Sequence, residues 1–414
     1  MARWFVGIDW GTTAHAVCVL DHAGQVVETR SVPHSAQGLA ELCEGLRARA
    51  DGDGAQVGVA IEVPHGVVVD TLLEQGFGVH AINPKQLDRF RDRFTVAGAK
   101  DDRLDARVLA DSLRTDGPRF RRLEVEAPHV IELREWSRLA EELSRERVRL
   151  THRVRAQLQR YYPQALELTD DLGAEWFLAL WELVPTPATA ATARTARVTR
   201  ILTQYRVRRI EAPEVLRRLR QPAVIVAPGT VEAATAHLGV LVARLRLINR
   251  ELTKCHHRLD VLCAELTGTA DAEDPRREQR DVTILRSLPG VGRIVLATLL
   301  AEASQPLRAR DYHALRSLGG VAPVTKRSGK SCVVLRRQAC DHRLREALYH
   351  WGRVAIQRDA ATRARYAHLR SRGHSHARAL RSVSDRLLAM ACAMLRDGTT
   401  YDPARRAAPR EAAA

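Results

Sequence analysis

Trp4-Phe-Val-Gly-Ile-Asp9 is the first of three β-rich runs at the start of the chain, and it is followed by Ala14 to Leu20 and Gln25 to Val32. Turn residues at 21–24 separate the second run from the third, so the three runs predict an antiparallel meander. Beyond the meander the pattern alternates. We expect helices over 38–49, 67–75 and 102–114, and strands over 57–61 and 79–82.

This order of strands and helices is typical of the ribonuclease-H-like fold, and it predicts an α/β domain over 1–127. The next region, 128–281, is predicted to be helical. One amphipathic helix covers 128–162, and leucines spaced three and four apart from Leu238 to Leu266 form a heptad seam. The seam is compatible with a coiled coil joining protomers and with a long helix packed on its own chain. Residues 185–200 are predicted to be a linker or an insertion, and 268–281 a second linker.

Composition points to a polyanionic partner. The 414 residues carry 65 Lys and Arg against 49 Asp and Glu, a net charge of +16, which favours nucleic acid through counterion release. The 7 cysteines form no CxxC pair, so we expect reduced thiols. The absence of a signal-like opening and of a long apolar run predicts a cytoplasmic, nucleoid-associated protein.

Four carboxylates occupy positions that a fold of this kind brings together. Asp9 ends the first strand, Glu62 follows a buried strand, and Asp102 and Asp105 share one face of a helix. Mutual repulsion of such a cluster would be relieved by Mg²⁺ or Mn²⁺, which prefer oxygen ligands. Two such ions can activate a hydroxyl or water for phosphodiester cleavage. Taken singly, an Asp after a strand is more often a turn residue or a helix cap than a ligand, so the prediction rests on the set of four.

Several stretches resemble those of RuvC-like DEDD transposases, which belong to bridge-RNA-guided insertion sequences and are relatives of the pilin-inversion recombinase. They are Gly7-Ile-Asp9, Ala60-Ile-Glu62, Ile82-Asn-Pro84 and Lys100-Asp-Asp-Arg-Leu-Asp-Ala106. The resemblance implies that Asp9, Glu62, Asp102 and Asp105 are the catalytic, metal-binding tetrad. Asp101 stands where the family usually has Ser or Thr, which makes it a rival ligand. Val63-Pro64 interrupts the family's Glu-x-Thr-Gly pattern.

The C-terminal region, 282–400, is predicted to be an all-α domain. Leu288-Pro-Gly-Val-Gly292 predicts a helix-hairpin-helix turn whose Gly290 and Gly292 amides could hold a DNA phosphate, or else a plain glycine connection. The segments 315–323 and Lys326-Arg-Ser-Gly-Lys330 resemble the family's C-terminal transposase domain. That resemblance implies that Ser328 is the nucleophile, near the metal in a composite site, and that Arg345 faces phosphate. Lys326, Arg327 and Lys330 could balance charge at the reacting phosphate.

The stretch from 336 to 381 in this region is also strongly basic, with only Asp341, Glu346 and Asp359 to balance a run of arginines. The imbalance favours phosphate contact over a merely solvated face. The run comprises Arg336, Arg337, Arg343, Arg345, Arg353, Arg358, Arg363, Arg365, Arg370, Arg372, Arg378 and Arg381. Residues 401–414 form an Ala/Arg/Pro-rich tail that we expect to be disordered.

These features together predict an RNA-guided insertion-sequence DNA transposase or recombinase. It would exchange strands of donor and target double-stranded DNA through Ser328 and Mg²⁺, with a noncoding guide RNA from its own element. We expect a homo-oligomer, a dimer assembling into a tetramer. The alternatives are a metal-dependent Holliday-junction-type nuclease, a DNA invertase without an RNA guide, and a DNA-binding protein with a dead nuclease fold.

Two further motifs are typical of other functions. Gly7 to Thr13 resembles the first phosphate loop of actin-like sugar kinases, but no second strand-borne loop is present. Cys255-His-His257 with Cys263 suggests zinc, although Cys255 falls in the heptad seam and the spacing matches no zinc finger.

Overall fold

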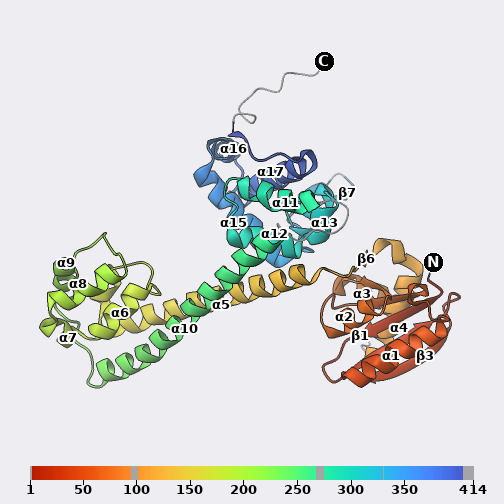
Figure 1. The fold of residues 1–414 in the computed structure, drawn as a ribbon, viewed down its shortest axis with the longest axis horizontal. Helices are drawn as coiled ribbons and strands as arrows, with labels where there is room; N and C mark the ends of the chain where they lie inside the picture. Colours follow the sequence, from red (N-terminus) through yellow and green to blue (C-terminus); the bar gives the residue numbers. More distant parts are fainter. Residues whose placement is uncertain (1, 95–100, 267–274, 330, 404–414) are drawn as a thin grey trace, which may run out of the picture. The chain divides into compact units, whose positions relative to one another are not determined.

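The computed structural model describes residues 2–94, 101–266, 275–329 and 331–403, with only the backbone of 275–280. The chain divides into two compact units, residues 1–127 and 128–414 (Figure 1). A further boundary near residue 281 stays a prediction. In the described part of the chain, no helix combines the length and apolar character needed to cross a bilayer.

The first unit is built on a six-stranded mixed sheet of order β3-β2-β1-β4-β5-β6. The first three strands pair antiparallel, β1 with β4 and β4 with β5 pair parallel, and β6 is antiparallel to β5. The predicted meander and the predicted strands over 57–61 and 79–82 are therefore confirmed. The strands are β1 (Trp4–Asp9), β2 (Ala14–Leu20), β3 (Val26–Pro33), β4 (Val57–Ile61), β5 (Gly78–Ala81) and β6 (Arg121–Arg122).

Helices cover both faces of this sheet. Val6 and Ile8 of β1 point to the face covered by α1 (Ala36–Arg49) and α2 (Val67–Glu74), where they join one apolar cluster. Alternate residues of the strand point to the opposite face, which is covered by α4 (Asp102–Asp116), with α3 (Pro84–Arg91) beside it. The short 3-10 turns of this unit are η1 (Gly54–Gln56) and η2 (Gly117–Arg119).

Gly7 sets how closely α4 approaches β1. A Cβ built on Gly7 would lie 1.8 Å from the carbonyl oxygen of Ala106 and 2.6 Å from the amide nitrogen of Ala110. Only a residue without a side chain fits there, so the helix lies directly on the strand backbone. This contact brings the first turn of α4 to the carboxyl end of β1.

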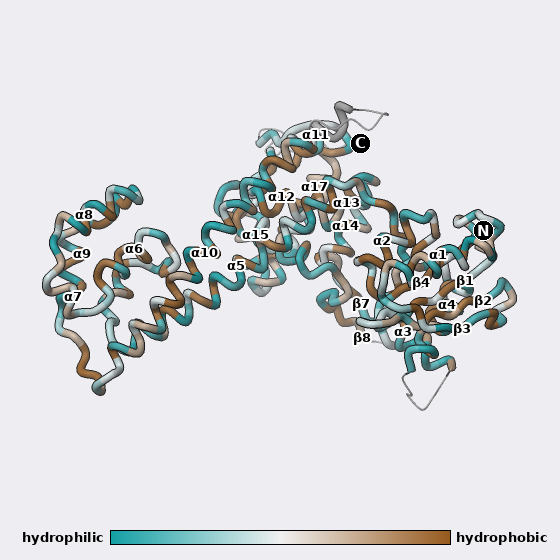
Figure 2. Tube along the Cα trace, turned by 60° about the horizontal axis from the view of Figure 1, so that its bottom comes forward, coloured by the Kyte–Doolittle hydropathy of each residue, from teal (hydrophilic) through white to brown (hydrophobic). Residues whose placement is uncertain are grey.

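Two long helices, α5 (Pro128–Tyr161) and α10 (Thr230–Glu265), form the centre of the second unit. They run antiparallel, because Arg258 pairs with Glu132 at one end and Arg153 contacts His237 toward the other. Figure 2 shows hydrophobic residues along both helices. The predicted seam is buried against α5 of the same chain, with Leu238 and Leu245 each 0% exposed. The seam is therefore an intrachain contact, and the alternative in which it joins protomers is wrong.

A small helical lobe connects the long helices. The linker interpretation of 185–200 is wrong, because the segment is helical: Thr186 forms a capping box that begins α7, and the buried Val198 and Leu202 lie one turn apart on α8. The other interpretation, an insertion, stays a prediction. Trp176 and Phe177 contribute to the same core. The lobe consists of η3 (Pro163–Glu167), α6 (Glu175–Leu183), α7 (Pro187–Thr192), α8 (Thr195–Gln204) and α9 (Ala212–Leu219).

The C-terminal region is not all-α as predicted, because it contains the hairpin of β7 (Val324–Ser328) and β8 (Ser331–Leu335). The first half of the predicted linker 268–281 and most of the tail 401–414 lie outside the described residues, and 275–281 is helical rather than a linker. The helices are α11 (Pro275–Ser287), α12 (Arg293–Glu302), α13 (Ser304–Arg308), α14 (Tyr312–Leu318), α15 (His342–Arg358), α16 (Ala360–Ser371) and α17 (His376–Asp397).

Candidate functional site

Asp9 and Glu62 occupy neighbouring positions at the ends of the adjacent strands β1 and β4. Ile8 of β1 pairs with Ile61 of β4, so the two acids occupy the next register position at the carboxyl ends of parallel strands. Both side chains are half-buried. Because Gly7 and Ala60 face α4, residues two further along each strand share that face. The strands therefore bring these two predicted site residues together at one edge of the sheet.

The first turn of α4 contributes the other two acids. Asp102 is exposed, whereas Asp105 is only 2% exposed. Asp101 occupies the N-cap position without a side-chain cap bond, and its carbonyl oxygen accepts from the Asp105 amide at 2.9 Å. Carboxylates at a helix N-terminus are favoured by the exposed amides and the helix dipole.

Arg91, at the end of α3, holds the buried Asp105. Its Nε donates to Oδ1 at 2.6 Å and its Nη2 donates to Oδ2 at 2.9 Å, while its Nη1 donates to Asp88 at 3.0 Å. The hydrogen bond to Asp105 raises the pKa of Arg91 above its ordinary value. Sequence reasoning missed this residue. Its helix begins at the Ile82-Asn-Pro84 stretch, where Asn83 caps the helix by accepting from the Lys85 amide.

The residue types of this corner suit a hard divalent cation, but their arrangement does not yet form a metal centre. In the described ranges, no three His, Cys, Asp or Glu side chains are grouped so that they could hold a metal ion. Both oxygens of Asp105 are engaged by Arg91. This finding also leaves the Cys255 and Cys263 zinc interpretation without support, since both thiols are buried on α10.

His15 orders the loop that follows Asp9. The imidazole is 0% exposed, and its Nδ1 accepts from the Gly11 amide at 3.3 Å. Its Nε2 lies 2.9 Å from Nδ1 of His34. Burial, and then the neighbouring His34, lower the pKa of His15. A neutral His15 therefore accepts from the loop and donates to His34.

Ser328 lies at the tip of the exposed β7–β8 hairpin. It is the last residue of β7 and pairs in register with Ser331, the first residue of β8. Gly329, which follows Ser328, has φ of +54°, in the left-handed region that favours glycine. The side chains of Lys326, Arg327 and Ser328 are all exposed. Lys330 lies outside the described residues.

The other predicted DNA-contacting residues, Gly290, Gly292 and Arg345, differ in how exposed they are. A Cβ on Gly290 would lie 2.8 Å from the Ala355 amide nitrogen, so this glycine serves close packing of the turn on α15. Trp351 Nε1 donates to the Pro289 carbonyl at 2.9 Å in the same contact. Gly292, at the N-cap of α12, is exposed with open space around it. Arg345 is half-buried, and its Nη2 contacts Nδ1 of His342 at 2.6 Å.

Comparisons with known proteins find transposase families that match the N-terminal and the C-terminal parts of the chain. A DEDD transposase family model matches residues 6–163, and a model described as "Transposase IS116/IS110/IS902 family" matches residues 282–367. The "Mini-circle putative transposase for IS117" of Streptomyces coelicolor is 32% identical over 413 residues, covering 98% of this chain and 97% of that protein. The "Putative transposase y4uE" of Sinorhizobium fredii is 47% identical over 275 residues, covering 66% of this chain and 73% of that protein. The chain therefore belongs to the IS110/IS116/IS902 family of insertion-sequence transposases.

Proposed function

We propose that this transposase cuts and exchanges DNA strands through a covalent bond to Ser328, under the guidance of a noncoding RNA from its own element. The observation that carries the proposal is the position of Ser328 on the exposed hairpin tip. A hydroxyl there is open to a scissile phosphate, and Lys326 and Arg327 precede it on the same strand. Their charges would stabilise the added negative charge of a pentacoordinate phosphorus.

The proposed step is an exchange of phosphoesters. Ser328 Oγ forms a bond to phosphorus and loses its proton to solvent, while the bond from phosphorus to the leaving deoxyribose oxygen breaks and that oxygen gains a proton. A deoxyribose hydroxyl of the second strand then attacks the phosphoserine and releases Oγ. The number of phosphoester bonds is conserved, so strand exchange needs no external energy source. A serine hydroxyl is a weak nucleophile at neutral pH and requires activation.

The acidic corner of the first unit is the proposed source of that activation. Asp9, Glu62, Asp102 and Asp105 would hold Mg²⁺ or Mn²⁺, which offsets phosphate charge and lowers the pKa of a bound hydroxyl. Support comes from the adjacent strand ends of Asp9 and Glu62 and from the first turn of α4. For Asp105 to join them, its carboxylate would have to leave Arg91.

The proposed partners are donor and target double-stranded DNA, the guide RNA and further copies of the chain. The net charge of +16 and the family membership support the nucleic-acid partners. A dimer that assembles into a tetramer stays our proposal. Because the α10 seam is buried against α5, assembly would use other surfaces.

Trapping the covalent intermediate tests the proposed nucleophile. Ser328→Ala should bind DNA normally but form no protein–DNA adduct that survives denaturation. Ser331→Ala is the matched control, because Ser331 is the exposed register partner on β8 and should leave the adduct intact. An adduct in Ser328→Ala would place the nucleophile elsewhere. DNA cleavage by the wild type without any adduct would instead favour the metal-dependent junction nuclease.

A further inference from the structure

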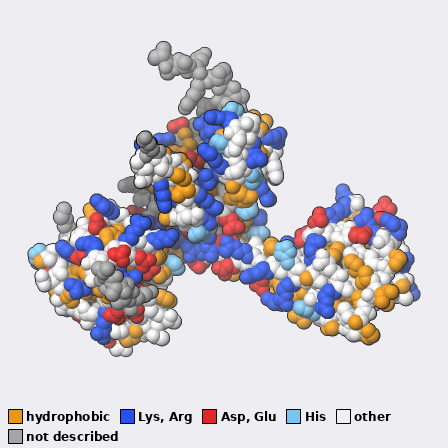
Figure 3. All heavy atoms as spheres, turned by 180° about the vertical axis from the view of Figure 1, so that it is seen from behind, with side chains coloured by type: hydrophobic (Ala, Val, Ile, Leu, Met, Phe, Trp, Pro, Cys, Tyr) orange, Lys and Arg blue, Asp and Glu red, His pale blue; other side chains and the backbone are white. Residues whose placement is uncertain are grey.

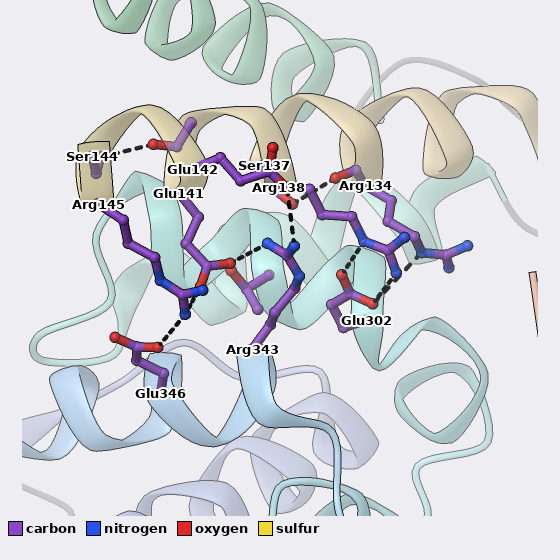
Figure 4. Close-up of polar contacts among 12 residues, drawn as sticks. Arg134, Ser137, Arg138, Glu141, Glu142, Ser144, Arg145, Glu302, Arg343 and Glu346 are labelled. Atoms are coloured by element: carbon purple, nitrogen blue, oxygen red, sulfur yellow. Dashed lines mark hydrogen bonds and ion pairs between the residues drawn. The ribbon is translucent and has the colours of Figure 1, made fainter. Parts of the chain in front are cut away.

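Many charged side chains of the long helices in the second unit are paired with each other. Arg138 of α5 binds Glu302, and Arg343 of α15 binds Glu141 of α5 (Figure 4). Along α10, further arginines pair with acids on α5 and α6. Figure 3 shows the resulting mixture of blue and red side chains along these helices. Paired charges of this kind hold helices together and leave little charge for a partner.

Trp10, in the first unit, differs from the other tryptophans because it packs in no apolar cluster of the described residues. It is 45% exposed, whereas the other five tryptophans all belong to or pack against these clusters. Trp10 follows Asp9 directly, in the loop between β1 and β2. An exposed indole offers a large flat apolar face that is stabilised when a second ring covers it. Trp10 is therefore an uncovered stacking surface next to a proposed site residue.

The loop that carries Trp10 is held in place by its own contacts. His15 Nδ1 accepts from the Gly11 amide at 3.3 Å, and the centroids of the Trp10 and His15 rings lie 6.4 Å apart. A Cβ on Gly11 would lie 2.2 Å from the Ala14 carbonyl oxygen, so the turn is too tight for a larger residue. A backbone that is already ordered loses less conformational entropy on binding, which favours this loop as a ligand contact.

Two cations on α3 lie in the same corner of the first unit. α3 crosses this corner, because its start follows the end of β5 and because Arg91 at its end binds Asp105 on α4. Lys85 and Arg89 are both exposed, and their spacing of four residues places them on one face of the helix. Among the described residues neither forms an ion pair, and the neighbouring Asp88 pairs with Arg91 instead.

The spacing of these groups matches a DNA strand. β1, β4 and β5 are parallel neighbours about 4.8 Å apart, so the ends of β1 and β5 are separated by about 10 Å. Nucleotides repeat about every 3.4 Å along one strand of a duplex, so about three nucleotides span this edge. A polynucleotide combines flat bases with phosphates, which are the two groups that an exposed indole and unpaired cations bind.

We infer that Trp10 stacks on a nucleobase of the DNA strand that crosses this edge, and that Lys85 and Arg89 bind phosphates of the same strand. The inference rests on the proposed cleavage of DNA at the acidic corner, and it names residues that hold the strand there. Because every base has a π-face, stacking is tolerant of sequence. Trp10 would therefore position the strand without reading its sequence.

Binding of the full chain to single-stranded DNA tests the stacking. The probes are an oligothymidylate of about 12 nucleotides and an abasic strand of the same length, which keeps the phosphates but has no bases. Trp10→Ala should bind the oligothymidylate about 5–150-fold more weakly than the wild type, the usual effect of losing one stacked base. It should bind the abasic strand as the wild type does. Trp10→Phe should retain most of the affinity, because its ring can still stack.

Val67→Ala is the matched control for the stacking. Val67 is 51% exposed and begins α2 after the end of β4, so this variant trims another exposed apolar side chain at the same edge. It should bind both strands as the wild type does. Thermal unfolding of the free variants checks that each one is folded.

Salt dependence tests the two cations. Lys85→Ala and Arg89→Ala should each reduce the slope of log affinity against log salt by about 0.7 with either strand, because they contact phosphates. Arg217→Ala is the matched control, since Arg217 is exposed but paired with Glu214, and its slope should equal that of the wild type. Unchanged slopes in both cation variants would overturn the assignment of Lys85 and Arg89.

The outcomes for Trp10 are separable from those for the proposed chemistry. Equal affinity of Trp10→Ala and the wild type for the oligothymidylate would overturn the inference. An equal loss with the abasic strand would also overturn it, because Trp10 would then support the fold or the backbone contact rather than a base. Neither probe needs metal or the Ser328 hydroxyl. Intact stacking in a chain that forms no Ser328 adduct would therefore refute the proposed strand exchange alone.

Discussion

Arg91 binds both carboxylate oxygens of Asp105, at 2.6 Å and 2.9 Å, and so supplies the positive charge next to the most buried acid of the proposed tetrad. Arg91→Ala should lower the free energy of unfolding by about 3 kcal/mol, because breaking a buried ion pair leaves one charge without compensation. Denaturant unfolding of the full chain measures this loss.

The matched control for that experiment removes the other partner. In an Asp105→Asn background there is no buried charge to compensate, so adding Arg91→Ala should cost much less than it does in the wild type. Equal costs in the two backgrounds would contradict a stabilising role for the ion pair. Addition of Mg²⁺ should recover part of the stability of Arg91→Ala, since the cation can then compensate Asp105.

Asp102→Asn should abolish recombination while leaving DNA binding intact. The substitution keeps the size of the side chain but removes the charge that the proposed metal requires. Asp101→Asn is the neighbouring control, since Asp101 is exposed and makes no side-chain cap bond. If Asp101→Asn lost recombination and Asp102→Asn retained it, Asp101 rather than Asp102 would be the metal ligand.

Leu245→Ala should destabilise the chain by about 2–5 kcal/mol, the usual cost of truncating a fully buried leucine. Leu245 is 0% exposed in the contact with α5, whereas Leu247 on the same helix is 48% exposed. Leu247→Ala should therefore stay within about 0.5 kcal/mol of the wild type. Denaturant unfolding compares the two. Dissociation of an oligomer by Leu245→Ala without loss of stability would contradict the intrachain packing.

Acidification should destabilise the loop after Asp9 through His15. Its pKa in the folded chain lies below the ordinary value of about 6.5, so the unfolded state binds more protons near that pH. The stabilisation is complete above about pH 6.5 and is lost as the pH falls toward the folded-state pKa. Thermal unfolding between roughly pH 8 and 5 measures this loss. The unfolding midpoint should fall less steeply with decreasing pH in His15→Gln than in the wild type. Identical pH profiles would show that His15 does not titrate on unfolding.

The purified transposase should carry a discrete RNA copied from the flank of its own element. This expectation rests on the proposed guide and on the net charge of +16. Sequencing of the copurified RNA identifies it, and nuclease treatment followed by a recombination assay tests its role. Recombination of the correct sites by RNA-free protein would show that no guide is needed.

Much of the first unit could be predicted because local patterns specify it. Alternating β-branched residues located β1 and β2 at the observed residues, and the helix beginning at Asp102 was also found. Placement of Asp9 and Glu62 at adjacent strand ends follows from that topology. Arg91 could not be found in this way, because its contact with Asp105 joins two helices and depends on how they pack.

In the second unit, periodicity revealed the helices but not their partners. A heptad seam looks the same whether it meets another chain or α5, since both surfaces are apolar. The hairpin was missed because its basic residues favoured a loop. The signal was nevertheless present, since only two residues, one of them Gly329, separate Val324–Ser328 from Ser331–Leu335 in the sequence.

The contact at Gly7 has a consequence for natural copies of the element. A methyl group at this position would meet the Ala106 oxygen at 1.8 Å and would force α4 away from β1. Such a copy would retain every acidic residue, yet its two pairs of carboxylates would be moved apart. A count of conserved acids would classify it as intact although a single added carbon had silenced it.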